Sequence, residues 1–189
     1  MGVITSQNHI FAFYYGEEHL LVKSNSFLKN GLKKDEKCYY CFKDLKTKRL
    51  IEQIKNKNAT AKQLSYLNIK IIINKYLTGG KKALKKELEK LLNQAKAEGY
   101  KKIRILNSPL LVREILADEQ LIIWEKELDE LLIEIDNISV LCQYDVKSII
   151  ENKDNLVEKE FLNRTLKAHS TLLNAEEIYQ INNKISINI

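Results

Sequence analysis

The stretch that best indicates the fold is Ile138-Ser139-Val140-Leu141-Cys142-Gln143-Tyr144-Asp145. Its first half is strongly apolar, as in a strand buried on both faces of a sheet. Its second half offers a thiol, an amide, a phenol and a carboxylate where such a strand ends. Because ligands bind at the carboxyl ends of strands in open α/β sheets, this segment is the first candidate for a functional site.

The segments before and after this stretch alternate between strand and helix patterns. We expect further strands at His9 to Tyr14, Lys37 to Phe42, Leu67 to Ile73 and Lys102 to Leu106. Helical spacing of apolar residues is found at Glu17 to Lys33, Leu45 to Lys57, Lys82 to Glu98, Leu110 to Glu134 and Leu156 to Lys167. Strands that alternate with amphipathic helices form βαβ units, so the sequence predicts a three-layer α/β sandwich with a mostly parallel sheet covered by helices on both faces.

Several details of this assignment depend on glycine and on apolar runs. The run Ile71-Ile72-Ile73 suggests a strand buried on both faces, and Thr78-Gly79-Gly80 would break the chain before the next helix. Gly99 is expected to end that helix, and Gly31 with the polar residues after it to end the first one. Thr171-Leu172-Leu173 and Ile178 to Ile181 predict a C-terminal edge hairpin.

Length and composition predict one soluble domain. The 189 residues suit a single α/β core at about 9–182 with a tail at 183–189, so we treat 1–189 as one domain. Its apolar stretches are shorter than the roughly 18 residues that cross a bilayer, and the N-terminus does not resemble an export signal. We therefore expect a cytoplasmic protein whose three cysteines stay reduced.

The loop after the first predicted strand argues against nucleotide hydrolysis. Its sequence, Tyr14-Tyr15-Gly16-Glu17-Glu18-His19, has one glycine and two carboxylates where a phosphate loop needs several glycines followed by Gly-Lys-Ser/Thr. The carboxylates would repel a triphosphate. Gly79-Gly80-Lys81-Lys82 lacks the phosphate-loop spacing and is better explained as a turn before a basic helix. We expect no enzyme activity and no catalytic residues.

Four candidate ligand-binding residues lie at the end of the fifth strand. Side-chain alternation places Cys142 and Tyr144 on one face and Gln143 and Asp145 on the other. For Tyr144 and Asp145 two roles remain open, because each can border a pocket or serve the fold, Asp145 by capping the next turn. For Cys142 a buried structural role is favoured. Two further candidates, Tyr15 and Glu17, follow the first strand at the same edge of the sheet.

The remaining cysteines and histidines do not predict a metal or redox centre. The C-x-x-C motif Cys38-Tyr39-Tyr40-Cys41 lies on a strand, where residues three apart point to opposite faces, and a second ligand pair is missing. His9 begins the first strand, so it should lie far from Asp145 and hydrogen-bond at the other edge. His19 matches no motif, and His169 is a plausible cap for the last helix. We expect no metal and no cofactor.

Charge is segregated along the chain. Residues 43–104 contain 18 Lys and Arg against 5 Asp and Glu, whereas residues 114–136 contain 9 acids and one Lys. Such segregation can support nucleic-acid binding or contacts between complementary surfaces, but it is also typical of a solvated lysine face. Aromatic residues are not interleaved with the basic ones, so we do not expect direct nucleic-acid binding. Trp124 has the helical spacing of a core residue, whereas Glu125 beside it can face either the sheet or solvent.

Five motifs, taken together and in this order, resemble the MEDS family, the methanogen/methylotroph DcmR-type sensory domain. They are His9 to Tyr14, Phe27 to Leu32, Glu36 to Tyr40, Glu98 to Tyr100 and Leu141 to Asp145. The last, which contains Cys-x-Tyr-Asp, is the most specific. The resemblance implies a fold distantly similar to the RecA/KaiC ATPases.

The resemblance also implies a function. The family is thought to detect small hydrocarbon derivatives and is usually joined to a DNA-binding or kinase module. We therefore expect a sensory, non-enzymatic domain that binds a small, largely apolar ligand at the carboxyl edge of the sheet. Its partner would be a separate signalling or transcription-regulatory protein, and self-association remains open. The alternative is a protein-interaction adaptor, derived from a degenerate ATPase, that binds no small molecule.

Overall fold

The computed structural model describes residues 8–41, 51–52, 62–147, 151, 156–169, 171–173 and 178–180. Their strands are β1 (His9–Tyr14), β2 (Lys37–Tyr40), β3 (Leu64–Tyr66), β4 (Ile103–Asn107), β5 (Ile138–Asp145), β6 (Thr171–Leu173) and β7 (Ile178–Gln180). Their helices include α1 (Gly16–Lys33), α3 (Ile69–Ala97), α4 (Pro109–Arg113), α5 (Asp118–Glu134) and α7 (Leu156–Leu166). Most of the helix predicted at Leu45 to Lys57 lies outside the described residues.

The strands form one sheet in the order β3-β2-β4-β5-β1-β6-β7. Each neighbouring pair from β3 to β6 is parallel, and β7 pairs antiparallel with β6. The α/β class and the parallel core are therefore confirmed. The residues that would connect β6 to β7 are outside the described part of the chain, so the edge hairpin stays a prediction.

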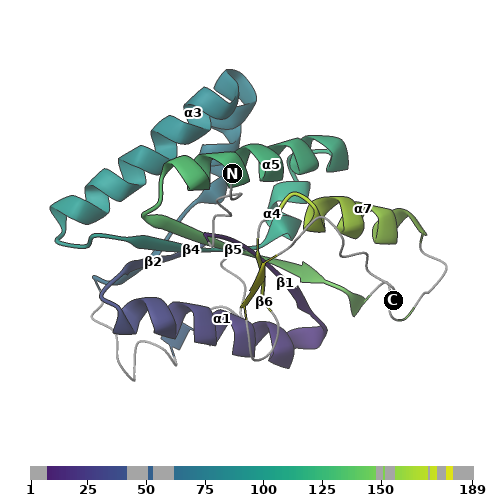
Figure 1. The fold of residues 1–189 in the computed structure, drawn as a ribbon, viewed down its shortest axis with the longest axis horizontal. Helices are drawn as coiled ribbons and strands as arrows, with labels where there is room; N and C mark the ends of the chain where they lie inside the picture. Colours follow the sequence, from purple (N-terminus) through teal and green to yellow (C-terminus); the bar gives the residue numbers. More distant parts are fainter. Residues whose placement is uncertain are drawn as a thin grey trace.

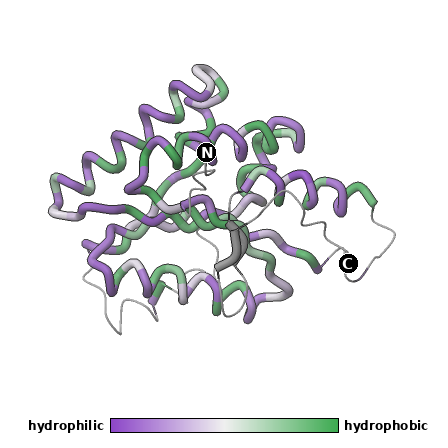
Figure 2. The backbone as a smooth tube through the Cα atoms, in the orientation of Figure 1, coloured by the Kyte–Doolittle hydropathy of each residue, from purple (hydrophilic) through white to green (hydrophobic). Residues whose placement is uncertain are grey.

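Helices cover both faces of the sheet. Helix α1 lies on one face, and α3, α4, α5 and α7 lie on the other (Figure 1). The central strands β4, β5 and β1 are apolar along much of their length, whereas the helices alternate between apolar and polar residues (Figure 2). Their apolar sides pack on the sheet and form one continuous core. No helix in the described ranges combines the length and apolar character that crossing a bilayer requires.

The strand predicted at Leu67 to Ile73 is wrong, because the isoleucine run begins helix α3. Ile69, Ile72 and Ile73 are buried, whereas Ile71 is 54% exposed. Burial at i, i+3 and i+4 is the helical period, and packing on the sheet outweighs the strand preference of β-branched residues. The short strand β3 lies just before this run.

Glycine acts differently in the two long helices. The predicted break at Thr78-Gly79-Gly80 is a kink inside α3, where Gly80 has φ 58° and ψ −153°. Gly99, at φ 96°, ends α3 as expected, because the Tyr100 amide donates to the Ala95 carbonyl and the Gly99 amide to that of Lys96. Helix α1 ends instead through Asp35, at φ 56°. The prediction is therefore wrong for Gly31 but confirmed for the run Lys33-Lys34-Asp35, where the helix ends.

Gly31 lies within α1 because the helix approaches the sheet closely there. A Cβ atom at this position would be 2.5 Å from Arg104 Cδ and 2.8 Å from Cys38 Sγ. We expect Gly31→Ala to lower the free energy of unfolding by about 1–3 kcal/mol through overpacking. Ser26→Ala, on the exposed side of the same helix, is the matched control and should change it little. Urea unfolding measures both, and equal stability of the two variants would contradict this packing.

The segregated charges meet within the molecule. Helix α3 is basic and α5 is acidic, and Lys81 and Lys85 form ion pairs with Glu130 and Glu134 at 2.5 and 2.7 Å. Lys70 of α3 likewise pairs with Glu114, at 3.0 Å. Three of the basic residues are therefore paired with acids of a neighbouring surface element.

Candidate functional site

Five polar side chains meet in the interior between the sheet and helix α5. They are His9 of β1, Glu125 of α5, Cys142 and Tyr144 of β5, and His169, which follows α7. All five are buried. We refer to them as the buried polar cluster. An interior cluster of this kind is costly unless its members compensate one another.

Glu125 is the centre of the cluster. His9 Nε2 lies 3.0 Å from its Oε2, and the Tyr144 hydroxyl donates to its Oε1 at 2.8 Å. His169 Nε2 is 3.4 Å from Oε2. On its other side, the His9 ring forms an ion pair with Asp129 of α5, Nδ1 to Oδ1 at 3.3 Å. The carboxylate is therefore surrounded by donors and potential cations although it is fully buried.

The local sequence explains why these groups converge. Strands β1 and β5 are parallel neighbours, with His9 opposite Val140 and Phe11 opposite Cys142, so alternate side chains of both strands face α5. The rings of Phe11 and Tyr144 stack with centroids 4.4 Å apart. On α5, Glu125 occupies a position of the apolar stripe between Leu121 and Leu128. The stripe therefore points a carboxylate at the sheet.

Histidine and carboxylate stabilise each other's charged forms. Burial alone would lower the pKa of His9, but the hydrogen bonds and charges of Asp129 and Glu125 outweigh it, so the pKa is raised. Burial alone would raise the pKa of Glu125, but the two histidines and the Tyr144 hydroxyl outweigh it, so the pKa is lowered. The surroundings therefore favour the charged forms of both His9 and Glu125.

The other members are neutral. Burial and the positive charge of His9 lower the pKa of His169 to about 3. Burial and the charge of Glu125 raise the pKa of the Cys142 thiol and of the Tyr144 phenol well above their usual values. A protonated, buried thiol is a poor nucleophile, so the cluster does not have the activated cysteine of a catalytic Cys/His pair.

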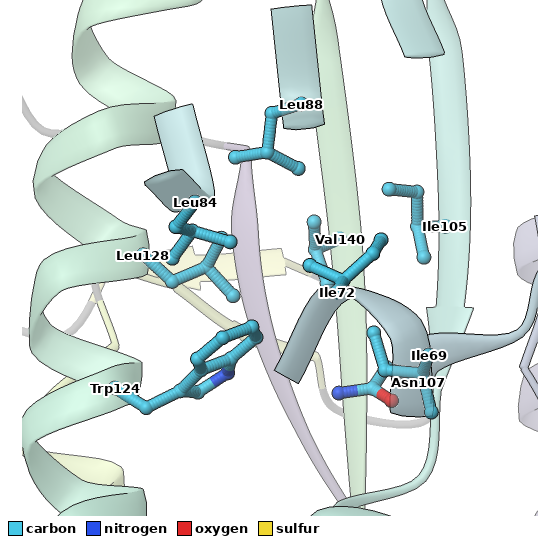
Figure 3. Close-up of a pocket in the computed structure, with 9 residues that line it drawn as sticks. All are labelled: Ile69, Ile72, Leu84, Leu88, Ile105, Asn107, Trp124, Leu128 and Val140. Atoms are coloured by element: carbon cyan, nitrogen blue, oxygen red, sulfur yellow. The ribbon is translucent and has the colours of Figure 1, made fainter. Parts of the chain in front are cut away.

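A small cavity lies beside the cluster, between α3, α5 and strands β4 and β5 (Figure 3). Its volume is about 20 Å³ for the centre of a water-sized molecule. Trp124 and Asn107 lie at one end and Leu88 at the other (Figure 3). The rest of its wall is aliphatic, formed by Ile69, Ile72, Leu84, Ile105, Leu128 and Val140.

Two polar atoms in the cavity wall have no hydrogen-bond partner within the described part of the chain. They are Asn107 Oδ1, an acceptor, and Trp124 Nε1, a donor. Asn107 Nδ2 lies 3.9 Å from Cys142 Sγ. The cavity is therefore apolar with one acceptor and one donor, and it adjoins the buried polar cluster.

The family model for MEDS, described as the methanogen/methylotroph DcmR sensory domain, matches residues 8–158. The chain belongs to the MEDS family. The match confirms the resemblance seen in the sequence and assigns a sensory role to the domain. No curated protein matches the chain significantly.

The structure of this MEDS domain brings together some of the residues predicted to bind a ligand. Cys142 and Tyr144 lie in the buried polar cluster, and the predicted alternation along β5 is confirmed. Gln143 faces α1, where its Oε1 accepts a hydrogen bond from Ser24 at 2.9 Å. Asp145 Oδ1 accepts from the Lys147 amide at 2.9 Å, which is the capping role left open above.

The two candidates that follow β1 lie away from the cluster. Tyr15 is 47% exposed, and Glu17 lies in the first turn of α1. Helix α1 covers the face of the sheet opposite α5, so Glu17 lies on the other side of the sheet from the cluster (Figure 1). Direct ligand contacts of Asp145, Gln143, Tyr15 and Glu17 remain predictions.

Sequence reasoning missed three members of the buried polar cluster as functional candidates, namely His9, Glu125 and His169. His9 hydrogen-bonds, as expected, but in the interior against α5. His169 does cap α7, with Nδ1 2.8 Å from the Thr165 carbonyl, and its other nitrogen faces Glu125. Of the C-x-x-C cysteines, Cys38 Sγ is 3.7 Å from the Leu28 carbonyl on the α1 side, and both thiols are buried and free.

Proposed function

We propose that this MEDS domain senses a small hydrocarbon derivative in the cavity between α3, α5 and the sheet. The ligand would have a short apolar chain and a single hydroxyl-like group. The supporting observation is the aliphatic wall with one acceptor and one donor left open, Asn107 Oδ1 and Trp124 Nε1. A hydroxyl donates to the first and accepts from the second. Ligand sites have this composition, mostly apolar with a few placed polar groups.

The size of the cavity limits the ligand. One water requires about 10–15 Å³ by the same measure, so a cavity of about 20 Å³ takes a molecule of very few heavy atoms. Larger ligands need Trp124 or Leu84 to move. The cavity also adjoins the carboxyl end of β4. A ligand in it would therefore lie near the carboxyl edge of the sheet, as expected from the sequence.

A route from the ligand to the protein surface passes through the buried polar cluster. Asn107 contacts Cys142 at 3.9 Å, Cys142 contacts Glu125 at 3.7 Å, and Glu125 contacts His169 at 3.4 Å. His169 is itself buried and lies just after α7. A ligand that binds Asn107 favours one arrangement of these contacting side chains over the others. This change in arrangement alters the surface around α7. A separate signalling or transcription-regulatory protein would read that surface.

Titration of the protein with short alcohols tests the proposal. Trp124 is the sole tryptophan, so its fluorescence reports on the cavity directly. We expect methanol to butanol to quench or shift it saturably and to raise the melting temperature, with an optimum chain length. Alkanes of equal size should bind about tenfold more weakly, as expected for loss of a hydrogen bond worth about 1.4 kcal/mol.

Asn107→Leu removes the acceptor without opening the cavity. It should weaken the best alcohol about tenfold and leave binding of the alkane unchanged. Asn93→Leu, on the exposed side of α3, is the matched control and should bind as the wild type does. Equal affinities of Asn107→Leu and wild type for the alcohol, or no saturable response of Trp124 to any compound, would refute the site.

Two further points belong to this proposal. We infer that the loop between β1 and α1 no longer binds a triphosphate and that the domain, distantly RecA/KaiC-like, has no catalytic activity.

The alternative is an adaptor that binds no ligand and contacts its partner through segregated surface charge. It is less well supported, because Lys81 and Lys85 are already paired with Glu130 and Glu134.

A further inference from the structure

Four donor atoms of the buried polar cluster are arranged around a common centre. They are His9 Nε2, Glu125 Oε2, Cys142 Sγ and His169 Nε2, and all lie within 4.8 Å of one another. They come from β1, α5, β5 and the segment after α7. All four residues are buried. Nitrogen, oxygen and sulphur donors of these types are the protein ligands of zinc.

His169 has a buried nitrogen that faces the Glu125 carboxylate without a hydrogen bond. Its Nδ1 faces the Thr165 carbonyl at 2.8 Å, and a carbonyl only accepts, so Nδ1 carries the proton. Nε2 then presents a lone pair. It is fully buried, has no hydrogen-bond partner among the described residues and lies 3.4 Å from the Glu125 carboxylate. A lone pair that faces a carboxylate in the interior is unfavourable unless a cation lies between them.

We propose that His9, Glu125, Cys142 and His169 bind one divalent transition-metal ion, Zn²⁺ or a close equivalent, in tetrahedral geometry. With the usual zinc–ligand lengths, the edges of such a tetrahedron are about 3.4 Å between nitrogen and oxygen and about 3.6 Å to sulphur. The observed separations from Glu125 Oε2 are 3.0 Å to His9 and 3.4 Å to His169. Those from Cys142 Sγ are 3.7 Å to His9 and 3.7 Å to Glu125.

Outer partners already orient three of the four ligands. Asp129 lies 3.3 Å from His9 Nδ1, and the Thr165 carbonyl lies 2.8 Å from His169 Nδ1. The Tyr144 hydroxyl donates to the carboxylate oxygen that does not face the centre, at 2.8 Å. Histidine ligands of zinc sites usually have such a carboxylate or carbonyl on the second nitrogen. A cluster that served only the fold would not need an outer partner on both histidines and on the carboxylate.

The charge and the rings also accommodate an ion. Binding replaces the proton between His9 and Glu125 and the thiol proton of Cys142, both of which leave to solvent. A divalent ion with one carboxylate and one thiolate is then neutral, which suits a dry interior. The two imidazole rings stack with centroids 3.9 Å apart and an interplanar angle of 25°. They must splay slightly for both lone pairs to meet at one centre.

Metal analysis of the whole chain tests the site directly. The protein is expressed without a histidine tag, and its metal content is measured after purification. We expect one zinc per chain. Stripping with a chelator and adding Co²⁺ should give a one-to-one complex with a thiolate-to-cobalt charge-transfer band and the intense visible absorption of tetrahedral cobalt. A folded wild type that takes up no stoichiometric zinc or cobalt, or a cobalt complex without the thiolate band, would overturn the proposal.

Variants identify the ligands. Cys142→Ser should abolish the charge-transfer band, and Asp129→Asn, an outer partner, should weaken metal binding about 10- to 100-fold. Cys38→Ser and His19→Ala change a cysteine and a histidine outside the donor set and should bind as the wild type does. Equal loss in these controls would overturn the assignment. Circular dichroism confirms that each variant is folded, and the wild-type stoichiometry decides the question if Cys142→Ser is not.

This inference is independent of the proposed alcohol site. The cavity is tested by Trp124 fluorescence and the Asn107→Leu variant, whereas the ion is tested by metal content and cobalt spectra. Either can fail while the other stands. If both hold, the ion ties His169 to the core and completes the route from the cavity to the segment after α7.

Discussion

Replacing Glu125 with alanine is expected to lower the free energy of unfolding by about 3–5 kcal/mol, the cost of removing one partner from a buried charge pair. The His9 imidazolium would remain in the interior with Asp129 alone, and the Tyr144 hydroxyl would lose its acceptor. Urea unfolding followed by circular dichroism, with a chelator present, measures the loss without any contribution from a bound ion.

Two other substitutions on α5 separate charge from shape. Glu125→Gln keeps the side-chain volume and can accept from Tyr144, so it should cost less than Glu125→Ala. Glu130→Ala removes an acid of the same helix whose carboxylate pairs with Lys81 at the surface and is 61% exposed. Exposed ion pairs contribute about 0–1 kcal/mol, so this control should be nearly neutral. Equal costs for Glu125→Ala and Glu130→Ala would show that the cluster does not stabilise the fold.

The parts of the fold that the sequence predicts well are those with a strong local period. The alternation of β5 and the aromatic run of β1 identify buried parallel strands, and the leucine stripe of α3 identifies a helix. The isoleucine run before that stripe was misassigned because a short apolar run fits both a buried strand and a helix. Burial of Ile72 and Ile73 with exposure of Ile71 is decided by the sheet beneath, which local sequence does not contain.

The site was harder to predict because its members are distant in sequence. His9 and Glu125 are 116 residues apart, and Cys142 and His9 are 133 apart. One signal was available: Glu125 lies four residues after Leu121 and three before Leu128, in the middle of an apolar stripe. A carboxylate at such a position must either be paired in the interior or break the stripe. The identity of its partners depends on strand order, which a single sequence does not give.

The cysteines of this chain differ in whether other metal-binding side chains lie beside them. The C-x-x-C pair, which looks like half a zinc site, lies on β2 and just after it, and residues three apart on a strand point to opposite faces. Cys38 Sγ lies against the backbone carbonyls of Leu28 and Glu36, at 3.7 and 3.6 Å, so its geometry does not suggest metal binding. Cys142, which no spacing rule singles out as a ligand, lies beside two histidines and a glutamate. Donor geometry in space, rather than spacing along the chain, supports the metal proposal.

Trp124→Ala is the second substitution with a large expected effect, a loss of about 3–5 kcal/mol in the free energy of unfolding. The side chain is 1% exposed, and its ring meets Tyr76 edge-on with centroids 4.8 Å apart. Because Trp124 forms one end of the cavity, its removal enlarges the existing space. Urea unfolding followed by circular dichroism measures the loss.

Ligand binding to the enlarged cavity shows whether Trp124 borders a pocket or only packs in the core. Apolar cavities of this kind bind aromatic molecules, so indole should raise the melting temperature of Trp124→Ala but not of the wild type. Phe161→Ala removes a comparably buried ring, 4% exposed, from α7, which does not border the cavity. It should be similarly destabilised without gaining a response to indole. If indole stabilised both variants equally, the space beside Trp124 would have no special capacity for ligands, and the sensing site would have to lie elsewhere in the domain.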